Sequence, residues 1–224
     1  MAENGRPEMS PAPLPASRWE AAVFDAVMGV VERTLLPGAR ARLLASADGD
    51  VLEVAAGTGL NVGHYPTACR LTLTDQNPSM LAIARKRVPA LEHPVAFAVA
   101  DAEDLPFPDA SFDTVVATLA LCEVPDPVAG LREMARVCRV GGRILLLDHV
   151  RSHHAGVGLI QDALNAVTVP LKGEHLNRDT IAFANAAGLS ILETHTWRLG
   201  IMRSLVLSPG ARQHGPEVVV AAGS

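Results

Sequence analysis

The chain has 224 residues, of which 49% are hydrophobic and 19% charged, and its formal net charge is -5. This length fits one α/β domain with a full core, and the composition is that of a globular rather than a disordered protein. Nineteen basic and 24 acidic residues, with no basic run, argue against binding to nucleic acid phosphates, so the expected partner is a small molecule.

The cysteine content indicates a reduced, cytoplasmic protein, and we expect a monomer or homodimer without a basis for choosing between them. The three cysteines are scattered and odd in number, so we expect neither a disulfide framework nor a metal site. The chain contains no run of about eighteen apolar residues, which a membrane span would need. Its proline-rich start lacks the apolar core of a signal peptide.

Three segments are expected along the chain. Residues 1–17 are predicted to be a disordered extension, because proline, serine and charged residues dominate them. Residues 18–208 are predicted to form the folded domain, and residues 209–224 a flexible tail. The domain opens with an apolar stripe at helical spacing that stops before Pro37, which is typical of an amphipathic helix.

A second helix, at about residues 39–47, leads into the stretch Val51–Asn61. Residues suited to a buried parallel strand run here into Gly57 and Gly59, and only glycine lets the backbone turn tightly beneath a ligand. A dinucleotide site needs a third glycine three places after the second, where this chain has Val62. The pattern therefore indicates a nucleotide site of another type.

Carboxylates accompany the first three predicted strands. Glu53 lies inside the first, Asp75 closes the second at residues 70–75, and Asp101 closes the third at residues 95–101. A carboxylate at the end of the neighbouring strand can reach ribose hydroxyls. Because this much negative charge would repel phosphates, we predict a nucleoside ligand without phosphates.

Helices and strands continue to alternate after Asp101. An Asn77-Pro78 cap starts one helix, and Asp126 caps another that is predicted to end at Gly141-Gly142. Two more helices are expected, at residues 156–169 and up to Ala187, where Gly188 stops the helix. Further strands are predicted at residues 112–122, 143–148, 189–197 and 202–207. This alternation is typical of a parallel sheet covered on both faces.

Four short motifs stand at or beside these strands: Glu53-x-Ala-x-Gly57-x-Gly59, Asp75, Asp101-Ala-Glu103 and Gly141-Gly142-Arg-Ile-Leu. In order and spacing they resemble the motifs of class I S-adenosylmethionine-dependent methyltransferases. The resemblance implies an α/β, Rossmann-like, doubly wound sheet of seven mostly parallel strands, with helices on both faces and an antiparallel last strand. It also implies S-adenosyl-L-methionine as cofactor and S-adenosyl-L-homocysteine as product.

The resemblance further implies which residues hold the cofactor. Asn61 either bonds the cofactor's carboxylate or caps a helix, Met80 packs on adenine or in the core, and Glu103 is a cofactor contact or an exposed loop acid. The family usually has glycine where Ala55 stands, and its first helix often forms a lid, which makes Trp19 and Phe24 candidate substrate contacts. The implied cofactor residues are Glu53, Ala55, Gly57, Gly59, Asn61, Asp75, Gln76, Met80, Asp101, Ala102, Glu103 and Leu119.

A narrower resemblance is to alkyl thiol methyltransferases and bacterial phosphatidylethanolamine N-methyltransferases, with ubiquinone/menaquinone C-methyltransferases as further relatives. The chain departs from these relatives at Asp148, where they have glutamate, and at Glu174, where they often have cysteine. It also lacks, at Ala117–Ala120, the Asn/Asp-Pro-Pro-aromatic stretch of nucleobase amino-methyltransferases. The matching pieces are Thr118–Cys122, Asp148–Arg151, Gln161-Asp162 and His175–Arg178.

Methyl transfer is an in-line displacement in which a base is optional. His149, beside Asp148 at the end of the predicted fifth strand, is the first candidate base, because ligands of open α/β sheets collect at that edge. The alternative is that His149 only fixes the strand-to-loop turn, and His175 is the second candidate base. We thus expect methyl transfer to a thiol, hydroxyl or amine of a small, partly apolar molecule. The alternatives are a non-catalytic cofactor sensor or scaffold and, more weakly, an NAD-dependent oxidoreductase.

Overall fold

The computed structural model describes residues 29, 34, 36, 38–88, 95–172 and 175–210. The expected disordered extension, Trp19, Phe24 and most of the expected tail lie outside the described residues. Within them, no helix is long and apolar enough to cross a lipid bilayer.

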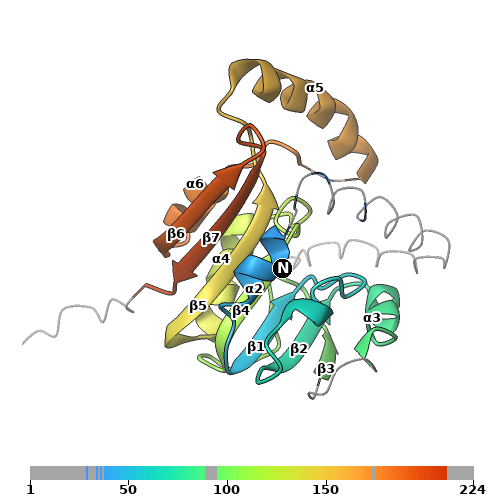
Figure 1. Cartoon of the computed structure of the whole chain (residues 1–224), viewed down its shortest axis with the longest axis vertical. Helices are drawn as coiled ribbons and strands as arrows, with labels where there is room; N and C mark the ends of the chain where they lie inside the picture. Colours follow the sequence, from blue (N-terminus) through green and yellow to red (C-terminus); the bar gives the residue numbers. More distant parts are fainter. Residues whose placement is uncertain are drawn as a thin grey trace, which may run out of the picture.

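Seven strands form one sheet in the order β3-β2-β1-β4-β5-β7-β6 (Figure 1). The pairs among β1 to β5 are parallel, whereas β7 is antiparallel to both β5 and β6. This order and the antiparallel last strand confirm the predicted fold. The strands are β1 Asp50–Val54, β2 Arg70–Asp75, β3 Val95–Val99, β4 Phe112–Thr118, β5 Cys138–His149, β6 Ser190–Trp197 and β7 Met202–Ser208.

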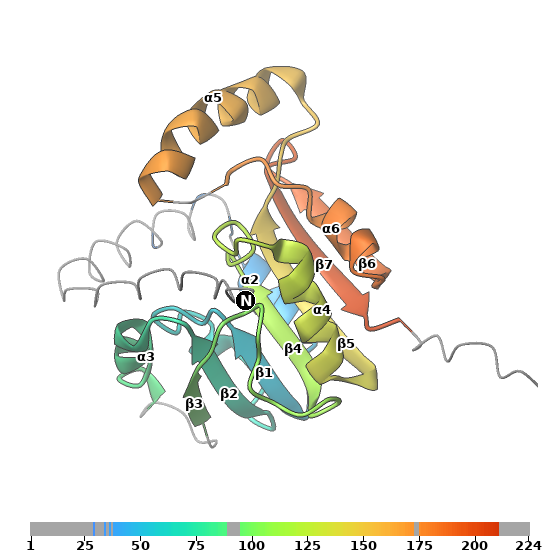
Figure 2. The same cartoon turned by 180° about the vertical axis from the view of Figure 1, so that it is seen from behind.

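Helices cover both faces of this sheet. One layer holds α2, η1 and α3, and the other holds α4 and α6 (Figure 2). Helix α5 stands apart from both layers, beyond the carboxyl end of β5 (Figures 1 and 2). The helices are α2 Ala39–Leu44, the 3-10 helix η1 Val62–His64, α3 Pro78–Ala84, α4 Pro127–Val137, α5 Ala155–Lys172 and α6 Thr180–Ala186.

Neighbouring apolar side chains of the central strands β1, β4 and β5 enter opposite hydrophobic clusters. Val51 of β1 and Leu145 of β5 pack beneath α2 and α3, whereas their neighbours Leu52 and Ile144 pack beneath α4 and α6. All four side chains are fully buried. Burial on both faces explains why the central strands are apolar throughout instead of alternating with polar residues.

The predicted end of α4 at Gly141-Gly142 is wrong. The helix ends at Val137, and the next residue, Cys138, begins β5 and pairs with Phe112 of β4. The register then shifts, so that Arg143 pairs with Thr114, and Gly141 has a φ of 84°. A Cβ atom on Gly142 would lie 2.5 Å from the Asp113 carbonyl oxygen. The two glycines therefore serve a bulge and a close strand approach, not a helix end.

The predicted helix caps are confirmed. The Asn77 side chain accepts a hydrogen bond from Ser79 N–H, and the Asp126 side chain accepts from Val128 N–H and Ala129 N–H. Gly188, with a φ of 78°, follows the last turn of α6. These caps start α3 and α4 directly after the loops that leave the sheet.

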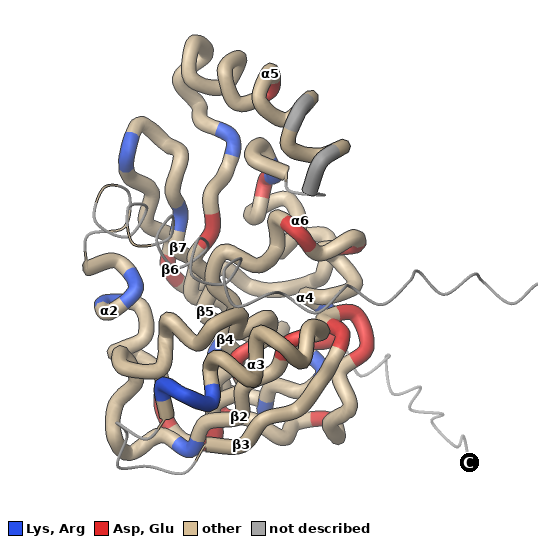
Figure 3. The backbone as a smooth tube through the Cα atoms, turned by 90° about the vertical axis from the view of Figure 1, so that its right-hand side faces the viewer, with Lys and Arg blue, Asp and Glu red and all other residues tan. Residues whose placement is uncertain are grey.

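Charged residues are dispersed over the described chain. Figure 3 shows its Lys and Arg residues as short, separate segments interrupted by acidic and uncharged ones.

Candidate active site

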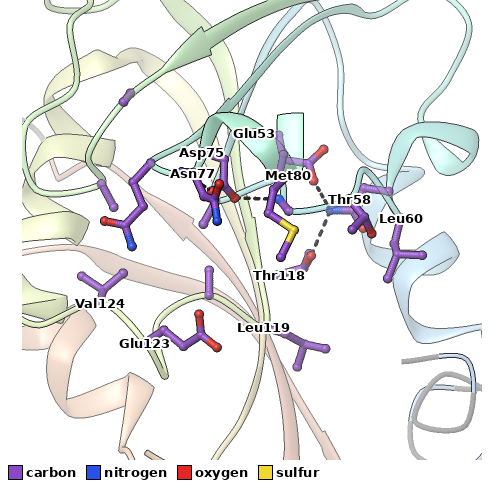
Figure 4. Close-up of a pocket in the computed structure, with 18 of the residues that line it drawn as sticks. Glu53, Thr58, Leu60, Asp75, Asn77, Met80, Thr118, Leu119, Glu123 and Val124 are labelled. Carbon is purple, nitrogen blue, oxygen red and sulfur yellow. Dashed lines mark hydrogen bonds between the residues drawn. The ribbon is translucent and has the colours of Figure 1, made fainter. Parts of the chain in front are cut away.

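A cavity of about 420 Å³ opens at the carboxyl ends of β1, β2, β3 and β4, where parallel strands bring their following loops together. Figure 4 shows Asp75 and Asn77 on one side of it and Leu119, Glu123 and Val124 on the opposite side. Ten of the twelve expected cofactor residues line it: Glu53, Ala55, Gly57, Asn61, Asp75, Gln76, Met80, Asp101, Ala102 and Leu119.

The loop after β1 forms the floor of the cavity. Gly57 has a φ of 55°, and its N–H donates a hydrogen bond of 2.8 Å to Asp75 Oδ2. No atom lies within 4 Å of the position a Cβ on Gly57 would take, so the glycine leaves open space. Ala55 also has a left-handed backbone, with a φ of 54°, which explains why glycine is the usual residue there.

Gly59 and Glu103 are absent from the cavity wall. A Cβ on Gly59 would lie 2.9 Å from the Cβ of Ala84, so this glycine permits the close approach of α3. Glu103 Oε1 accepts a hydrogen bond of 2.8 Å from Asp126 N–H and thereby fixes the start of α4. In this structure both residues support the loops around the site.

Glu53 is a buried carboxylate with two donors. It is 2% exposed, Oε1 accepts a hydrogen bond of 2.8 Å from Asn61 Nδ2, and Oε2 accepts one of 2.7 Å from the Tyr65 hydroxyl. Burial raises the pKa of Glu53 to about 7, against the lowering effect of Tyr65, Asn61 and Arg40. This group therefore changes its charge near neutral pH.

Asn61 joins this network instead of capping η1. Its side chain makes no capping hydrogen bond, and its amide also donates a hydrogen bond of 2.9 Å to Thr118 Oγ1. The Arg40 guanidinium donates to Asn61 Oδ1, and it donates a second bond, of 2.9 Å, to Thr118 Oγ1. The helix-capping alternative is thus not what the structure shows.

Arg40 lines the cavity and was missed from the sequence. It is only 3% exposed, although it lies on a short helix rich in arginine. The available signal was helical spacing: Arg40 precedes the buried Leu43 and Leu44 by three and four residues, whereas Arg42 lies on the exposed side. An arginine on the apolar face of a helix indicates a buried hydrogen-bonded role.

Asp75 is held by backbone donors. Its Oδ1 accepts from Asn77 N–H and its Oδ2 from Gly57 N–H, both at 2.8 Å. Burial raises the pKa of Asp75, and these two hydrogen bonds oppose the rise. Each carboxylate oxygen keeps a further lone pair that a ligand hydroxyl can use.

The expected catalytic residues lie beside the cavity but do not line it. Leu121 N–H donates a hydrogen bond of 3.1 Å to Asp148 Oδ2, and burial raises the pKa of Asp148 to about 6. His175 N–H donates a bond of 3.1 Å to the Cys122 carbonyl. Burial and the nearby Arg178 lower the pKa of His175. Asp148, His149 and His175 therefore adjoin the loop after β4, several of whose residues form the cavity wall.

The donor set fits a positively charged nucleoside with a carboxylate tail. Glu53, Asp75 and Asp101 suit hydroxyl, amino and cationic groups, and Arg40 suits a carboxylate. The open space above Gly57 leaves room for the ligand against the backbone. The doubly wound sheet makes this a Rossmann-like protein. The carboxylates and Arg40 at the carboxyl ends of its strands fit an adenosyl cofactor without phosphates.

Sequence comparison gives the family. A family model described as a methyltransferase domain matches residues 52–146. The phosphatidylethanolamine N-methyltransferase of Cereibacter sphaeroides is 37% identical over 150 residues, which cover 66% of this chain and 72% of that protein. The ubiquinone/menaquinone biosynthesis C-methyltransferase UbiE of Azotobacter vinelandii is 35% identical over 141 residues, covering 59% of this chain and 55% of that one. The chain belongs to the class I S-adenosylmethionine-dependent methyltransferases.

Solved structures show the same fold. A methyltransferase of Bacillus halodurans has a TM-score of 0.62 and 24% identity over 72% of each chain. The O-methyltransferase NcsB1, solved with S-adenosylmethionine and a naphthoic acid, has a TM-score of 0.65 and 22% identity over 85% of this chain and 57% of its own. The [4+2]-cyclase SpnF has a TM-score of 0.55 and 27% identity over 82% of this chain and 63% of its own.

Proposed function

We propose that this S-adenosylmethionine-dependent methyltransferase transfers its methyl group by in-line displacement to a thiol, hydroxyl or amine of a small, partly apolar molecule. The observation that carries the proposal is the two-sided cavity. Asp75 and Asn77 lie on one side, and the opposite side holds the apolar Leu119 and Val124 together with Glu123 (Figure 4). When bound, the cofactor supplies an electrophilic methyl group on a positively charged sulfur.

We propose a role for each side of the cofactor pocket. Asp75 accepts hydrogen bonds from the ribose hydroxyls, Met80 packs against adenine, and Asp101 accepts from the adenine amino group. The network of Glu53, Asn61 and Arg40 holds the amino acid end. Support comes from the order of these residues around one cavity and from the opposite charges of Glu53 and Arg40 beside each other.

Catalysis is proposed to depend mainly on alignment and exclusion of water. Correct alignment of two reactants can contribute roughly 7–11 kcal/mol to lowering a barrier. Leu119, Val124 and Pro125 make the acceptor side largely apolar, with Glu123 as its one acid among the lining residues, and this wall excludes water from an apolar acceptor and holds its nucleophilic atom toward the cofactor. A partly apolar acceptor therefore matches this wall best.

Acceptors that must lose a proton need a base as well. We propose His149, oriented by Asp148, and His175 as candidates, because both adjoin the loop that forms the acceptor wall. Since neither lines the cavity, direct proton transfer to either requires a movement of this loop or a bridging water.

The activities of the relatives do not identify the atom that this protein methylates. Those with similar sequence or fold are named as N-, C- and O-methyltransferases, and one is a cyclase. Family membership favours methyl transfer over the sensor and oxidoreductase alternatives. We further propose that the protein is cytoplasmic and a monomer or homodimer; for the cytoplasm, the support is that none of the three described cysteines forms a disulfide.

The proposal is tested in two stages. Isothermal titration should show binding of S-adenosylmethionine and S-adenosylhomocysteine. Radiolabelled donor is then offered to matched panels of small thiols, phenols, alcohols and amines of increasing apolar size. Labelled product that increases with apolar size supports the proposal. Binding without product in any panel would refute the acceptor class while leaving the cofactor site intact.

A further inference from the structure

Three side chains of metal-ligand type meet behind the loop after β4. The Cys122 sulfur, a carboxylate oxygen of Asp148 and a ring nitrogen of His149 all lie within 4.8 Å of one another. Cys122 is 4% exposed and Asp148 2%, and both His149 ring nitrogens are buried. None of the three lines the cofactor cavity, although Asp148 and His149 are also the residues proposed above as an acid–base pair.

Asp148 is the buried acid of this cluster, and the Arg178 guanidinium acts on it electrostatically from nearby. Its Oδ2 accepts a hydrogen bond from Leu121 N–H, whereas no described residue donates to the buried Oδ1. A buried carboxylate oxygen without a donor costs free energy, and such groups in native proteins are usually satisfied by water, a partner or an ion. A bound cation beside Oδ1 would remove this cost.

We propose that Cys122, Asp148 and His149 bind a divalent metal ion, with Zn²⁺ the best match. Thiolate, imidazole and carboxylate are the three ligand types that zinc takes in proteins. Zinc bonds of about 2.0–2.3 Å place tetrahedral ligand atoms about 3.3–3.7 Å apart. The observed limit of 4.8 Å exceeds this spacing by roughly 1 Å, so metal binding requires side-chain rotations that bring the three ligand atoms closer. Three protein ligands leave the fourth position open.

The elements that carry the ligands are already fixed. Asp148 and His149 end β5, where they pair with Arg203 and Met202 of β7. The Arg178 guanidinium donates to the carbonyl oxygens of Leu121 and Val124, on either side of the third ligand, Cys122. A site built on held backbone needs little reorganisation to accept a metal.

Metal binding would have two consequences for the proposed function. It would tie the loop containing Cys122 to the end of β5 and stiffen the acceptor wall, to which Leu119 and Val124 of the same loop belong. A metal-bound His149 imidazole cannot accept a proton, which would leave His175 as the candidate base. The inference departs from the expectation, based on sequence alone, that the protein holds no metal.

The experiment measures metal binding to the full chain without cofactor or acceptor, so its result is independent of methyl transfer. Metal-free protein is titrated with Co²⁺, and Zn²⁺ retained after dialysis is measured by elemental analysis. The wild type should bind one ion per chain and show a sulfur-to-cobalt charge-transfer band. Cys122→Ser should lose the band and bind at least tenfold more weakly, as expected when a ligand is lost.

Cys138→Ser is the matched control, because Cys138 is 3% exposed and lies outside the cluster. It should keep both the band and the affinity. Circular dichroism checks that each variant folds. If Cys122→Ser does not fold, His149→Gln takes its place in the Co²⁺ titration. The inference is overturned if the wild type gives no charge-transfer band, or if the cluster variants bind Co²⁺ as tightly as Cys138→Ser.

Discussion

At the scale of single residues, the site combines buried charge with backbone strain. Glu53 is enclosed by Asn61 and Tyr65, and its burial outweighs their hydrogen bonds. Ala55 and Leu119, on two loops of the same cavity, both have positive φ angles, of 54° and 53°. Left-handed backbone at residues other than glycine costs free energy that the surrounding fold must supply.

The buried Glu53 should make stability depend on pH. Its pKa rises from 4.5 in an open chain to about 7 in the folded protein, so the folded state binds the extra proton between these values. The free energy of unfolding should therefore fall as pH rises from about 4.5 to 7, by up to roughly 3 kcal/mol, and change no further above that range. Urea unfolding of the wild type and Glu53→Gln at pH 5, 6, 7 and 8 measures the difference.

In that series the wild type should lose stability relative to Glu53→Gln as pH rises. The exposed Glu123→Gln in the same cavity is the control and should show no comparable trend. A constant difference between the wild type and Glu53→Gln would show that Glu53 is not protonated in the folded state.

Replacement of Ala55 by glycine should stabilise the protein by about 0.5–1 kcal/mol. The left-handed backbone costs alanine about 1–2 kcal/mol, and glycine removes this cost. Glycine also loses more chain entropy on folding, which offsets about 0.5–1 kcal/mol of the gain. Ala110→Gly is the control, since Ala110 has a φ of 53° on an exposed loop away from the cavity. Urea unfolding should show a gain for both. A gain at Ala110 alone would mean that another contact requires the alanine methyl at position 55.

At the scale of elements, helix and strand types follow from periodicity, but the boundary between α4 and β5 does not. The pattern of Leu131 and Met134 continues to Cys138 at helical spacing, and Gly141-Gly142 is a plausible helix end. Pairing of Cys138 with Phe112 overrides this local preference, because hydrogen bonding to β4 satisfies the backbone in an extended form. The strand partner is distant in sequence, so local spacing carries no information about it.

Gly142→Ala should therefore destabilise the protein by about 1–3 kcal/mol. The added methyl group would lie 2.5 Å from the Asp113 carbonyl oxygen and 2.9 Å from the Cys138 sulfur, which forces the paired strands apart. Gly156→Ala on α5 is the control, because nothing lies within 4 Å of its added Cβ and alanine favours a helix. Thermal unfolding should separate the two variants. Equal stability would show that the bulge absorbs a side chain without cost.

At the scale of the whole molecule, the parallel sheet decides which residues meet. Because strands β1 to β4 run the same way, their following loops reach one edge and form a single cavity there. The same arrangement brings Cys122 to the end of β5, next to Asp148 and His149. Asp75 and Met80, which we propose as cofactor contacts, thus lie opposite Leu119 and Val124, which we propose as part of the acceptor wall (Figure 4).

Removal of the Asp75 carboxylate should weaken cofactor binding without changing the preferred acceptor. Loss of a hydrogen bond to a charged group costs about 1.5–3 kcal/mol, which corresponds to roughly a 10- to 150-fold rise in Kd. Titration of Asp75→Ala with S-adenosylhomocysteine measures the loss, and Glu193→Ala on the exposed strand β6 is the control. A change in the order of acceptors within the panels would contradict the assignment of Asp75 to the cofactor alone.

The sequence by itself determined the fold class, the glycine turn after the first strand and the carboxylates at the strand ends. These features depend on local periodicity and on the freedom of glycine, which neighbouring residues reveal. Only the tertiary structure decided that Arg40 is buried in the cavity, that Gly141 and Gly142 form a bulge, and that Cys122, Asp148 and His149 meet. The burial of a side chain, the register of a strand and the meeting of distant residues all arise when segments far apart in the sequence pack together. A local sequence pattern does not specify which distant segments these are.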